Sequence, residues 1–296
     1  MPELPEVETV VRGLNKLIIG KKIIKISSDN YKSFPISQHD SEKFILNATV
    51  LKVSRRAKII IINLSSAYSL VVHLKMTGQL VYKSSQQSWG GGHPNGSLVN
   101  NLPDKSTRVT ITFDDNSKLF FNDQRKFGWM KLFQTTELPA ISSLAKLGPE
   151  PLEAEFTEKI FLSNLHRRLK SKIKPVLLDQ TIISGIGNIY ADESLFKAKI
   201  HPESIVGQIP QAKLKKLRKA IVEILNYSIE KGGSTSQNYV NAEGKRGNYL
   251  DFAAVYGRSK LDCIVCQAPI TKIKLAGRGT HICLKCQKKY TLSSTE

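Results

Sequence analysis

Apolar residues near the start of the chain recur with the period of an α-helix. They leave one face of that helix apolar and the other polar, which is the pattern of a helix packed against a core. Gly20 follows the last of them, at a position where helices commonly end. We therefore predict an amphipathic helix built on Val7, Val10, Val11, Leu14, Leu17 and Ile18.

Short apolar runs rich in Val, Ile and Phe follow this helix and are separated by turn residues. Such runs are typical of strands in an antiparallel sandwich or barrel. The segment 84–105 is instead rich in Gly, Pro, Asn and Ser and has little periodicity, so we predict a long mobile loop there. We predict strands over residues 21–27, 49–54, 58–64, 69–74, 79–83, 108–113, 118–121 and 130–133.

The pattern changes near residue 135. A linker with two Pro-containing turns is predicted over 137–152, and a Gly-rich polar stretch covers 231–249. Helical spacing is found between them, over 155–169, 172–180, 187–198 and 211–231. We predict an α+β protein with a β-sandwich domain at 1–134, a helical domain at 150–231, a loop region at 232–256 and a cysteine-containing module at 257–290.

The chain carries a formal net charge of +19, and its basic residues lie among patterned apolar ones rather than in one polar tail. This surface favours a polyanionic partner, and we expect nucleic acid rather than an anionic membrane surface. No apolar run approaches the roughly 20 residues of a membrane span. The start also lacks the pattern of a signal peptide. We therefore expect a cytoplasmic protein with no membrane partner.

All four cysteines fall close to the C-terminal end, in two Cys-x2-Cys pairs: Cys263 with Cys266, and Cys283 with Cys286. This spacing matches a tetrahedral zinc site with four thiolate ligands. Two disulfides are the alternative, which a cytosolic setting disfavours. His281 could replace one thiolate as a ligand, although four sulfurs already complete the shell. We predict one structural Zn²⁺ ion.

The first residues carry candidate chemistry. Because proline is small, we expect Met1 to be removed, which leaves the secondary amine of Pro2 at the start of the chain. Such an amine can attack an aldehyde carbon and form an iminium ion. With a pKa of about 8, against about 10.4 for lysine, a terminal amine has the larger neutral fraction at pH 7. Glu3 could exchange protons beside it. Pro5 and Glu6 are explained by an ordinary helix start, with Glu6 as an organiser of the first turn.

Several motifs occur together and in order along the chain. They are PELPEVE (2–8), RRAK (55–58), HLKMTGQL (73–80), NDQRKFG (122–128), GIGNIYADE (185–193) and GRGTH (277–281), together with the cysteine pairs. This set, which extends from Pro2 to Gln287, resembles the formamidopyrimidine-DNA glycosylase family.

The resemblance implies a fold and an activity. The fold would be an N-terminal antiparallel β-sandwich with an N-terminal helix, followed by a helix–two-turn–helix domain and a zinc-finger β-hairpin. The activity would be that of a base-excision repair enzyme, and we expect it to act as a monomer. It would bind double-stranded DNA containing oxidised purines such as 8-oxoguanine and formamidopyrimidines. It would excise the base and then cut the strand as an AP lyase, by β,δ-elimination.

The resemblance also implies roles for residues in the motifs. Pro2 would be the nucleophile that forms the Schiff base, and Glu3 would protonate the sugar ring oxygen. Lys58 corresponds to a β-hairpin lysine that works near the lesion; without the resemblance it would be interpreted as a solvated turn lysine. The loop at 232–256 would fold over the extruded base.

Further roles concern the DNA around the lesion. Extruding a base leaves a gap in the stack, which Met76 would fill while Arg125 pairs with the orphaned cytosine and Phe127 wedges between bases. Contacts to phosphates would come from Lys174, Asn188 and Arg278, with Asn188 at a helix start that suits an anion.

Some positions depart from the family pattern. Ser106 and Arg108 stand where a His-x-His pair is common, so that Arg108 is a candidate phosphate contact. Gln124, Lys126 and Gln237 also replace frequent residues, and lesion preference depends most on the last of these. Two alternatives stay open: an endonuclease VIII-type glycosylase for oxidised pyrimidines, and a non-catalytic zinc-finger DNA-binding protein. Retention of Pro2, Glu3 and Lys58 together argues against the second.

Overall fold

The computed structural model of the 296-residue chain describes residues 1–93, 101–233 and 249–291. The chain forms two compact units. Residues 1–145 and 231–248 belong to the first unit, and 146–230 and 249–296 to the second. Each unit has its own hydrophobic core. The predicted α+β class is confirmed, whereas the predicted division into four domains stays a prediction.

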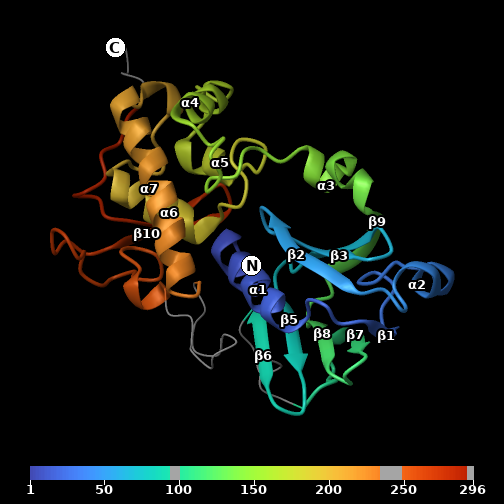
Figure 1. The fold of residues 1–296 in the computed structure, drawn as a ribbon. Helices are drawn as coiled ribbons and strands as arrows, with labels where there is room; N and C mark the ends of the chain where they lie inside the picture. The colour runs from blue at the N-terminus through green and yellow to red at the C-terminus, as the bar shows by residue number, and fades with distance from the viewer. Residues whose placement is uncertain (94–100, 234–248, 292–296) are drawn as a thin grey trace. The chain divides into compact units, whose positions relative to one another are not determined.

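The first unit contains the predicted N-terminal helix and all of the predicted strands (Figure 1). Its elements are α1 (Leu4–Leu17), β1 (Ile23–Ser28), α2 (Gln38–Phe44), β2 (Val50–Arg56), β3 (Ile59–Leu64), β4 (Tyr68–His73), β5 (Gly78–Lys83), β6 (Ser88–Gly92), β7 (Thr107–Phe113), β8 (Lys118–Asp123), β9 (Trp129–Gln134), a 3-10 helix (Thr135–Ala140) and α3 (Ser142–Ala145).

These strands form two antiparallel sheets in the described part of the unit. The order is β1-β7-β8-β5-β6 in one sheet and β2-β3-β4-β9 in the other. Apolar side chains from both sheets meet in one core, including Ile60 and Val72 from the second sheet and Ile111 and Phe121 from the first. The unit is therefore a sandwich, one of the two architectures that the strand pattern left open.

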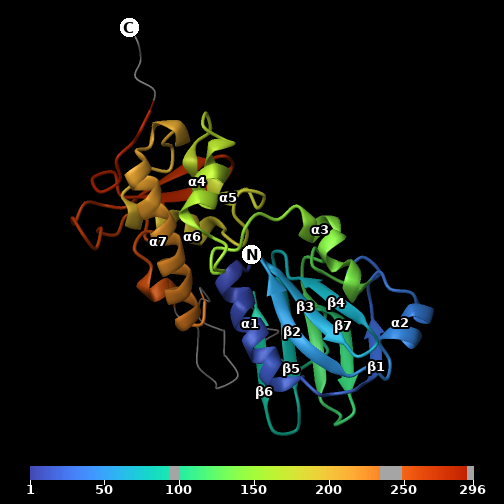
Figure 2. The same cartoon turned by 45° about the horizontal axis from the view of Figure 1, so that its top comes forward.

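Helix α1 lies beside β2 and β6, as both views show (Figures 1 and 2). Its apolar face is buried, with Val7, Val10 and Leu14 inaccessible to solvent. A Cβ atom at Gly13 would lie 2.2 Å from Cζ2 of the Trp89 indole. Only glycine at this position lets β6 approach the helix so closely.

The prediction of a long loop over 84–105 is wrong in part, because β6 forms inside it and pairs with β5. Trp89 is buried, and the glycines that follow it pack where side chains would collide; a Cβ at Gly91 would lie 2.7 Å from Val10. Residues 94–100 of the predicted loop lie outside the described residues. Helix α2 was also not predicted, although Ser37 caps it by accepting the N–H of Asp40.

The second unit contains the predicted helices and a two-stranded hairpin. None of the helices in the described part of the chain is both long and apolar enough to cross a membrane. The elements are α4 (Glu158–His166), α5 (Ile173–Leu178), α6 (Asn188–Ala198), a 3-10 helix (Val206–Gln208), α7 (Gln211–Glu230), a second 3-10 helix (Tyr249–Phe252), β10 (Thr271–Leu275) and β11 (Arg278–Ile282).

Candidate functional site

Two buried carboxylates are fixed at the start of α1. Glu3 is the N-cap residue and forms a capping box with Glu6. The Glu3 carboxylate accepts the main-chain N–H of Glu6, and Oε2 of Glu6 accepts the N–H of Glu3 at 2.7 Å. The two residues are only 3% and 5% exposed. This reciprocal pairing holds both carboxylates in place and supports the interpretation of Glu6 as an organiser.

The amino group at the start of the chain lies within reach of these charges. Burial lowers the pKa of the Met1 amine below its ordinary value of 8.0; Glu3 and Glu6 act to raise this pKa, and Lys58 lowers it. A lower pKa leaves more of the amine neutral, as a nucleophile requires. Pro2, the next residue, is buried as well. The Met1 amine thus interacts electrostatically with Glu3 and Lys58, and Pro2, whose amine would take its place at the start of the chain once Met1 is removed, is the residue beside it.

Lys58 occupies the turn between β2 and β3. Arg56 pairs with Ile59, which leaves a two-residue connection in which Ala57 has a φ of +54°. Lys58 is only 7% exposed. A solvated turn lysine would be far more exposed, so that this alternative does not describe Lys58. The predicted hairpin position is confirmed.

Gly233 contacts the start of α1. Its φ is +88°, and a Cβ atom there would lie 3.2 Å from Oε1 of Glu6 and 3.4 Å from its Cα. The Gly232–Gly233 pair therefore brings the chain against the carboxylates, where a side chain would not fit. Residues 234–248 of the predicted recognition loop, Gln237 among them, lie outside the described residues.

Three predicted DNA-inserting side chains lie on two exposed loops of the first unit. Met76 is 40% exposed in the connection between β4 and β5. Phe127 is 53% exposed in the turn after β8, with the guanidinium carbon of Arg125 4.6 Å from the centre of its ring. Exposed apolar side chains beside a cation are suited to enter a base stack.

The second unit places two predicted phosphate contacts near one hairpin. Arg278 is exposed at the tip of the β10–β11 hairpin, after a two-residue turn in which Ala276 and Gly277 both have positive φ. Asn188 begins α6, as predicted, and its Nδ2 donates to the carbonyl of Gly279 at 3.0 Å. The Asn188 side chain thus contacts the strand that carries Arg278.

Two other predicted phosphate contacts are buried. Lys174 is 0% exposed; its Nζ lies 2.7 Å from Oδ1 of Asp192 and donates to Thr280 Oγ1 at 2.7 Å. Arg108 is 4% exposed, and its guanidinium pairs with Asp29 and donates to the carbonyl of Asp123 at 2.9 Å. Such surroundings favour structural roles for both side chains, and their phosphate contacts stay predictions.

The four cysteines form one cluster in the second unit. Their Sγ atoms all lie within 4.8 Å of one another, with 3.9 Å between Cys263 and Cys286 and 3.4 Å between Cys266 and Cys283. A tetrahedral zinc ion with Zn–S bonds of about 2.3 Å requires sulfur separations of about 3.8 Å. The cysteines are free thiols, which rules out the disulfide alternative. The donor set fits one structural zinc ion.

His281 is not part of that cluster within the described residues. Its main-chain N–H donates to Oδ2 of Asp192 at 2.9 Å, and its ring packs against Tyr256. The thiolates therefore suffice as ligands, as the cysteine spacing predicted.

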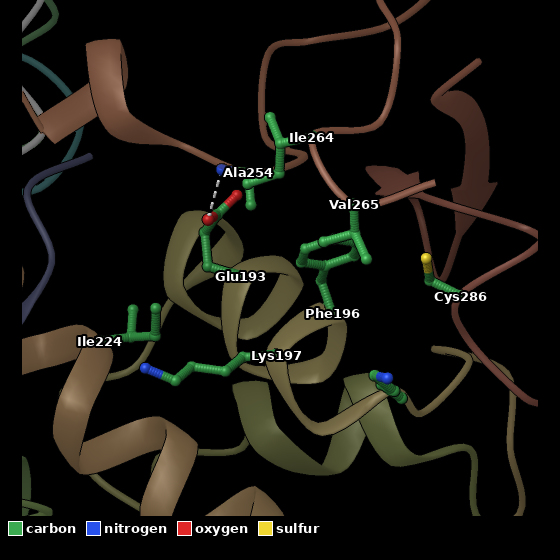
Figure 3. Close-up of a pocket in the computed structure, with 9 residues that line it drawn as sticks. Glu193, Phe196, Lys197, Ile224, Ala254, Ile264, Val265 and Cys286 are labelled. Atoms are coloured by element: carbon green, nitrogen blue, oxygen red, sulfur yellow. Dashed lines mark hydrogen bonds between the residues drawn. The ribbon is translucent and has the colours of Figure 1, made fainter. Parts of the chain in front are cut away.

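A carboxylate of α6 holds the segment that leads into the zinc module. Glu193 is 2% exposed and accepts the main-chain N–H groups of Ala254, Val255 and Tyr256 at 2.8–2.9 Å; Figure 3 shows the first of these bonds. Burial raises the pKa of Glu193, which these hydrogen bonds oppose. The Glu193 side chain also lines a cavity of about 290 Å³, which the zinc ligand Cys286 lines as well.

Comparison with known proteins agrees with both units. Residues 1–130 match the formamidopyrimidine-DNA glycosylase N-terminal domain, 147–240 the H2TH domain of the same family, and 262–289 a zinc finger found in FPG and IleRS. The formamidopyrimidine-DNA glycosylase of Desulforamulus reducens is 37% identical over 291 residues, which is 97% of this chain and 99% of that protein.

The chain belongs to the formamidopyrimidine-DNA glycosylase family. Two solved structures of the Lactococcus lactis FPG cover 97% of this chain and 100% of theirs at 37% identity. One, with a TM-score of 0.86, is a mutant in complex with a Fapy-dG containing DNA. The other, with a TM-score of 0.84, is the wild type in complex with an oxidized pyrimidine containing DNA.

Membership of the formamidopyrimidine-DNA glycosylase family makes this chain a DNA glycosylase and AP lyase of base-excision repair with a zinc finger. Interpretation of the sequence missed four residues of the site: Gly233, Asp123, Asp192 and Glu193. All three acids lie inside motifs of the resemblance, NDQRKFG and GIGNIYADE. Their location inside these motifs is the one sequence signal that could have drawn attention to the three acids.

Proposed function

We propose that this chain excises oxidised purines from double-stranded DNA through a Schiff base on Pro2. The neutral amine attacks C1′ of the damaged nucleotide, and a C–N bond forms as the glycosidic bond breaks and the base leaves with its electron pair and with the proton released by the nitrogen. Glu3 donates a proton to the ring oxygen, so that the sugar opens to an iminium ion. The iminium makes the C2′ proton acidic, and its loss begins the eliminations that expel the 3′ and then the 5′ phosphate.

The observation that carries this proposal is the burial of Pro2 and Glu3 at the start of α1 and of Lys58 in the β2–β3 turn. The Met1 amine, next to Pro2, already has a pKa lowered by burial, and the capping box fixes the carboxylate that would exchange protons with the sugar. Lys58 adds a positive charge that favours both the neutral amine and a nearby phosphate. A non-catalytic DNA-binding protein would have no use for this arrangement.

The DNA contacts that we propose come from exposed side chains. Met76, Arg125 and Phe127 would fill the gap left by the extruded nucleotide, and Arg278 and the start of α6 at Asn188 would contact phosphates. The partner would be a duplex with a single damaged nucleotide, and we propose that one monomer suffices. Light scattering of the complex would test the stoichiometry.

Trapping by borohydride tests the proposal, because reduction of the iminium makes the adduct permanent. Wild type should form an adduct with a duplex carrying 8-oxoguanine opposite cytosine, and Pro2→Gly should lose it. Pro5→Ala is the matched control: it changes the neighbouring proline of the same helix start and should keep the adduct. A chain that forms no adduct on any lesion would refute the Schiff-base proposal.

Oxidised pyrimidines are the second candidate substrate class. The observation in favour is that a relative 37% identical was solved with an oxidized pyrimidine containing DNA. The same trapping experiment with thymine glycol decides between the classes. Faster trapping on 8-oxoguanine supports the purine assignment, and trapping on thymine glycol alone would reverse it.

A further inference from the structure

A buried carboxylate organises the turn that carries Arg125 and Phe127. Asp123 ends β8 and is 0% exposed. Its Oδ2 accepts the main-chain N–H of Gly128 at 2.6 Å, and its Oδ1 accepts that of Arg125 at 3.2 Å. The turn 123–128 is thus closed around one side chain by hydrogen bonds to a charged acceptor, the stronger kind.

The same carboxylate also binds the loop that carries Met76. The hydroxyl of Thr77, which directly follows Met76, donates to Oδ1 of Asp123. Thr77 Oγ1 in turn accepts the N–H of Arg125 at 3.1 Å. One carboxylate and one hydroxyl therefore connect two exposed loops that are far apart in the sequence.

The surrounding backbone leaves little freedom for either loop. Gly78 pairs with Asp123 across β5 and β8. A Cβ at Gly128 would lie 3.1 Å from Oδ2 of Asp123 and 2.8 Å from the Phe121 ring. Lys126, between Arg125 and Phe127, has a φ of +55°. Few other backbone arrangements would satisfy these contacts together.

We infer that Asp123, acting with Thr77, is a positioning residue that holds Met76, Arg125 and Phe127 as one rigid group for insertion into DNA. The inference rests on the proposed insertion roles of these three side chains. Exposed side chains on independent loops would lose conformational entropy when they enter the duplex together. Loops joined beforehand lose less, so that more of the contact energy is available to extrude the nucleotide.

The test compares two substrates that differ in the need for insertion. Excision from a duplex carrying 8-oxoguanine opposite cytosine requires the extruded nucleotide to be replaced in the stack. Cleavage of a single-stranded oligonucleotide with an abasic site requires only the amine and its proton donors. Thr77→Val removes the hydroxyl at nearly constant volume, Thr77→Ser restores it, and Asp123→Asn removes the charge.

We expect Thr77→Val and Asp123→Asn to slow single-turnover excision from the duplex by about tenfold or more. Cleavage of the single strand should stay within about twofold of wild type. Thr77→Ser should restore most of the duplex rate, and the exposed Asp114→Asn serves as a control for the loss of one acidic charge. Duplex rates at the wild-type level in both variants, or equal losses on both substrates, would overturn the inference.

Hydrogen exchange of the free protein tests the connection without any activity. In Thr77→Val, the amides of Arg125 and Gly128 and those of residues 74–78 should exchange about tenfold faster, while the rest of the first unit is unchanged. Unchanged exchange in both loops would overturn the inference. A wild type that cleaves neither substrate would instead refute the proposed function, and the exchange data would still decide whether the connection exists.

Discussion

Lys174 and Asp192 form an ion pair that water does not reach. Nζ lies 2.7 Å from Oδ1, and the two side chains are 1% and 0% exposed. The pair joins α5 to α6, and the same ammonium and carboxylate bind Thr280 and the N–H of His281 in β11. It therefore connects the start of the helix pair to the hairpin that carries Arg278.

Lys174→Met should destabilise the second unit by about 3–5 kcal/mol, because it leaves the Asp192 carboxylate buried without its partner. The double variant Lys174→Met/Asp192→Asn should recover much of this loss, since the asparagine side chain carries no charge and still accepts a hydrogen bond. Urea unfolding followed by far-UV circular dichroism measures the effect.

The control is Lys172→Met: this exposed lysine pairs with Glu203, and its loss should cost less than about 1 kcal/mol. Equal losses in the two single variants would contradict the prediction.

Gly233→Ala should slow excision by about tenfold or more, because the new Cβ presses on Glu6 and displaces the carboxylates of the capping box. The φ of +88° adds a backbone cost of about 1–2 kcal/mol. Gly20→Ala separates the two effects: Gly20 has a φ of +79°, but nothing lies within 4 Å of its Cβ position. It should lose similar stability and keep the excision rate. Single-turnover kinetics and thermal unfolding of both variants provide the comparison, and an equal slowing by Gly20→Ala would speak against contact with Glu6.

Periodicity predicted most of the regular elements because the spacing of their apolar residues can be seen directly in the sequence. Helix α1 and the strand pairs of both sheets have such spacing. Strand β6 could not be predicted in this way, since Trp89 and three glycines provide no alternation, and its pairing depends on the fit of Trp89 against Gly13. The short helix α2 is polar, and burial of only Ser41 leaves no apolar face to detect.

The site was predictable where a residue acts through its own chemistry. The cysteines and Glu3 belong to this class, whereas Lys58 was singled out only by the resemblance of the motif that contains it. The rest depends on partners that the sequence does not pair. Basic side chains such as Lys174 are usually exposed, and only the fold reveals that Asp192 buries this one. Asp123 was missed for the same reason, since its partner Thr77 comes from another loop.

His73 should make the stability of the first unit depend on pH. Burial, with Lys75 and Lys58 adding repulsion, lowers the pKa of His73 from 6.5 to about 3. Its Nδ1 accepts the N–H of Lys75 at 3.0 Å, which requires an unprotonated ring. The unfolded chain binds a proton at this residue below pH 6.5 while the folded chain does not. Stability from the neutral ring is therefore complete above that pH and is lost as the pH falls toward 3.

His73→Asn should remove this dependence, because an amide oxygen can accept the Lys75 N–H without binding a proton. Between pH 6 and 4 the wild type should lose up to about 1.4 kcal/mol per pH unit more than the variant. Urea titrations followed by tryptophan fluorescence report on the first unit, which holds both tryptophans, Trp89 and Trp129. The matched control is His39→Asn at an exposed position, which should keep the wild-type slope. Parallel curves for wild type and His73→Asn would exclude the buried histidine as the cause.

Removal of zinc should unfold the hairpin module and leave the β-sandwich intact. Without the metal, the four buried or half-buried thiols lose the ion that joins them. Binding of zinc by such a site supplies about 10–16 kcal/mol of folding free energy to a small module. A chelator, or Cys263→Ser, should therefore abolish duplex binding, while the fluorescence of the two tryptophans, both in the first unit, stays at the wild-type level. Ile264→Ser is the control: it changes an exposed residue of the same knuckle and should keep both zinc and DNA binding. Zinc release measured with a chromophoric chelator should coincide with the loss of binding. Full duplex affinity after complete release would show that the hairpin holds its shape without the metal.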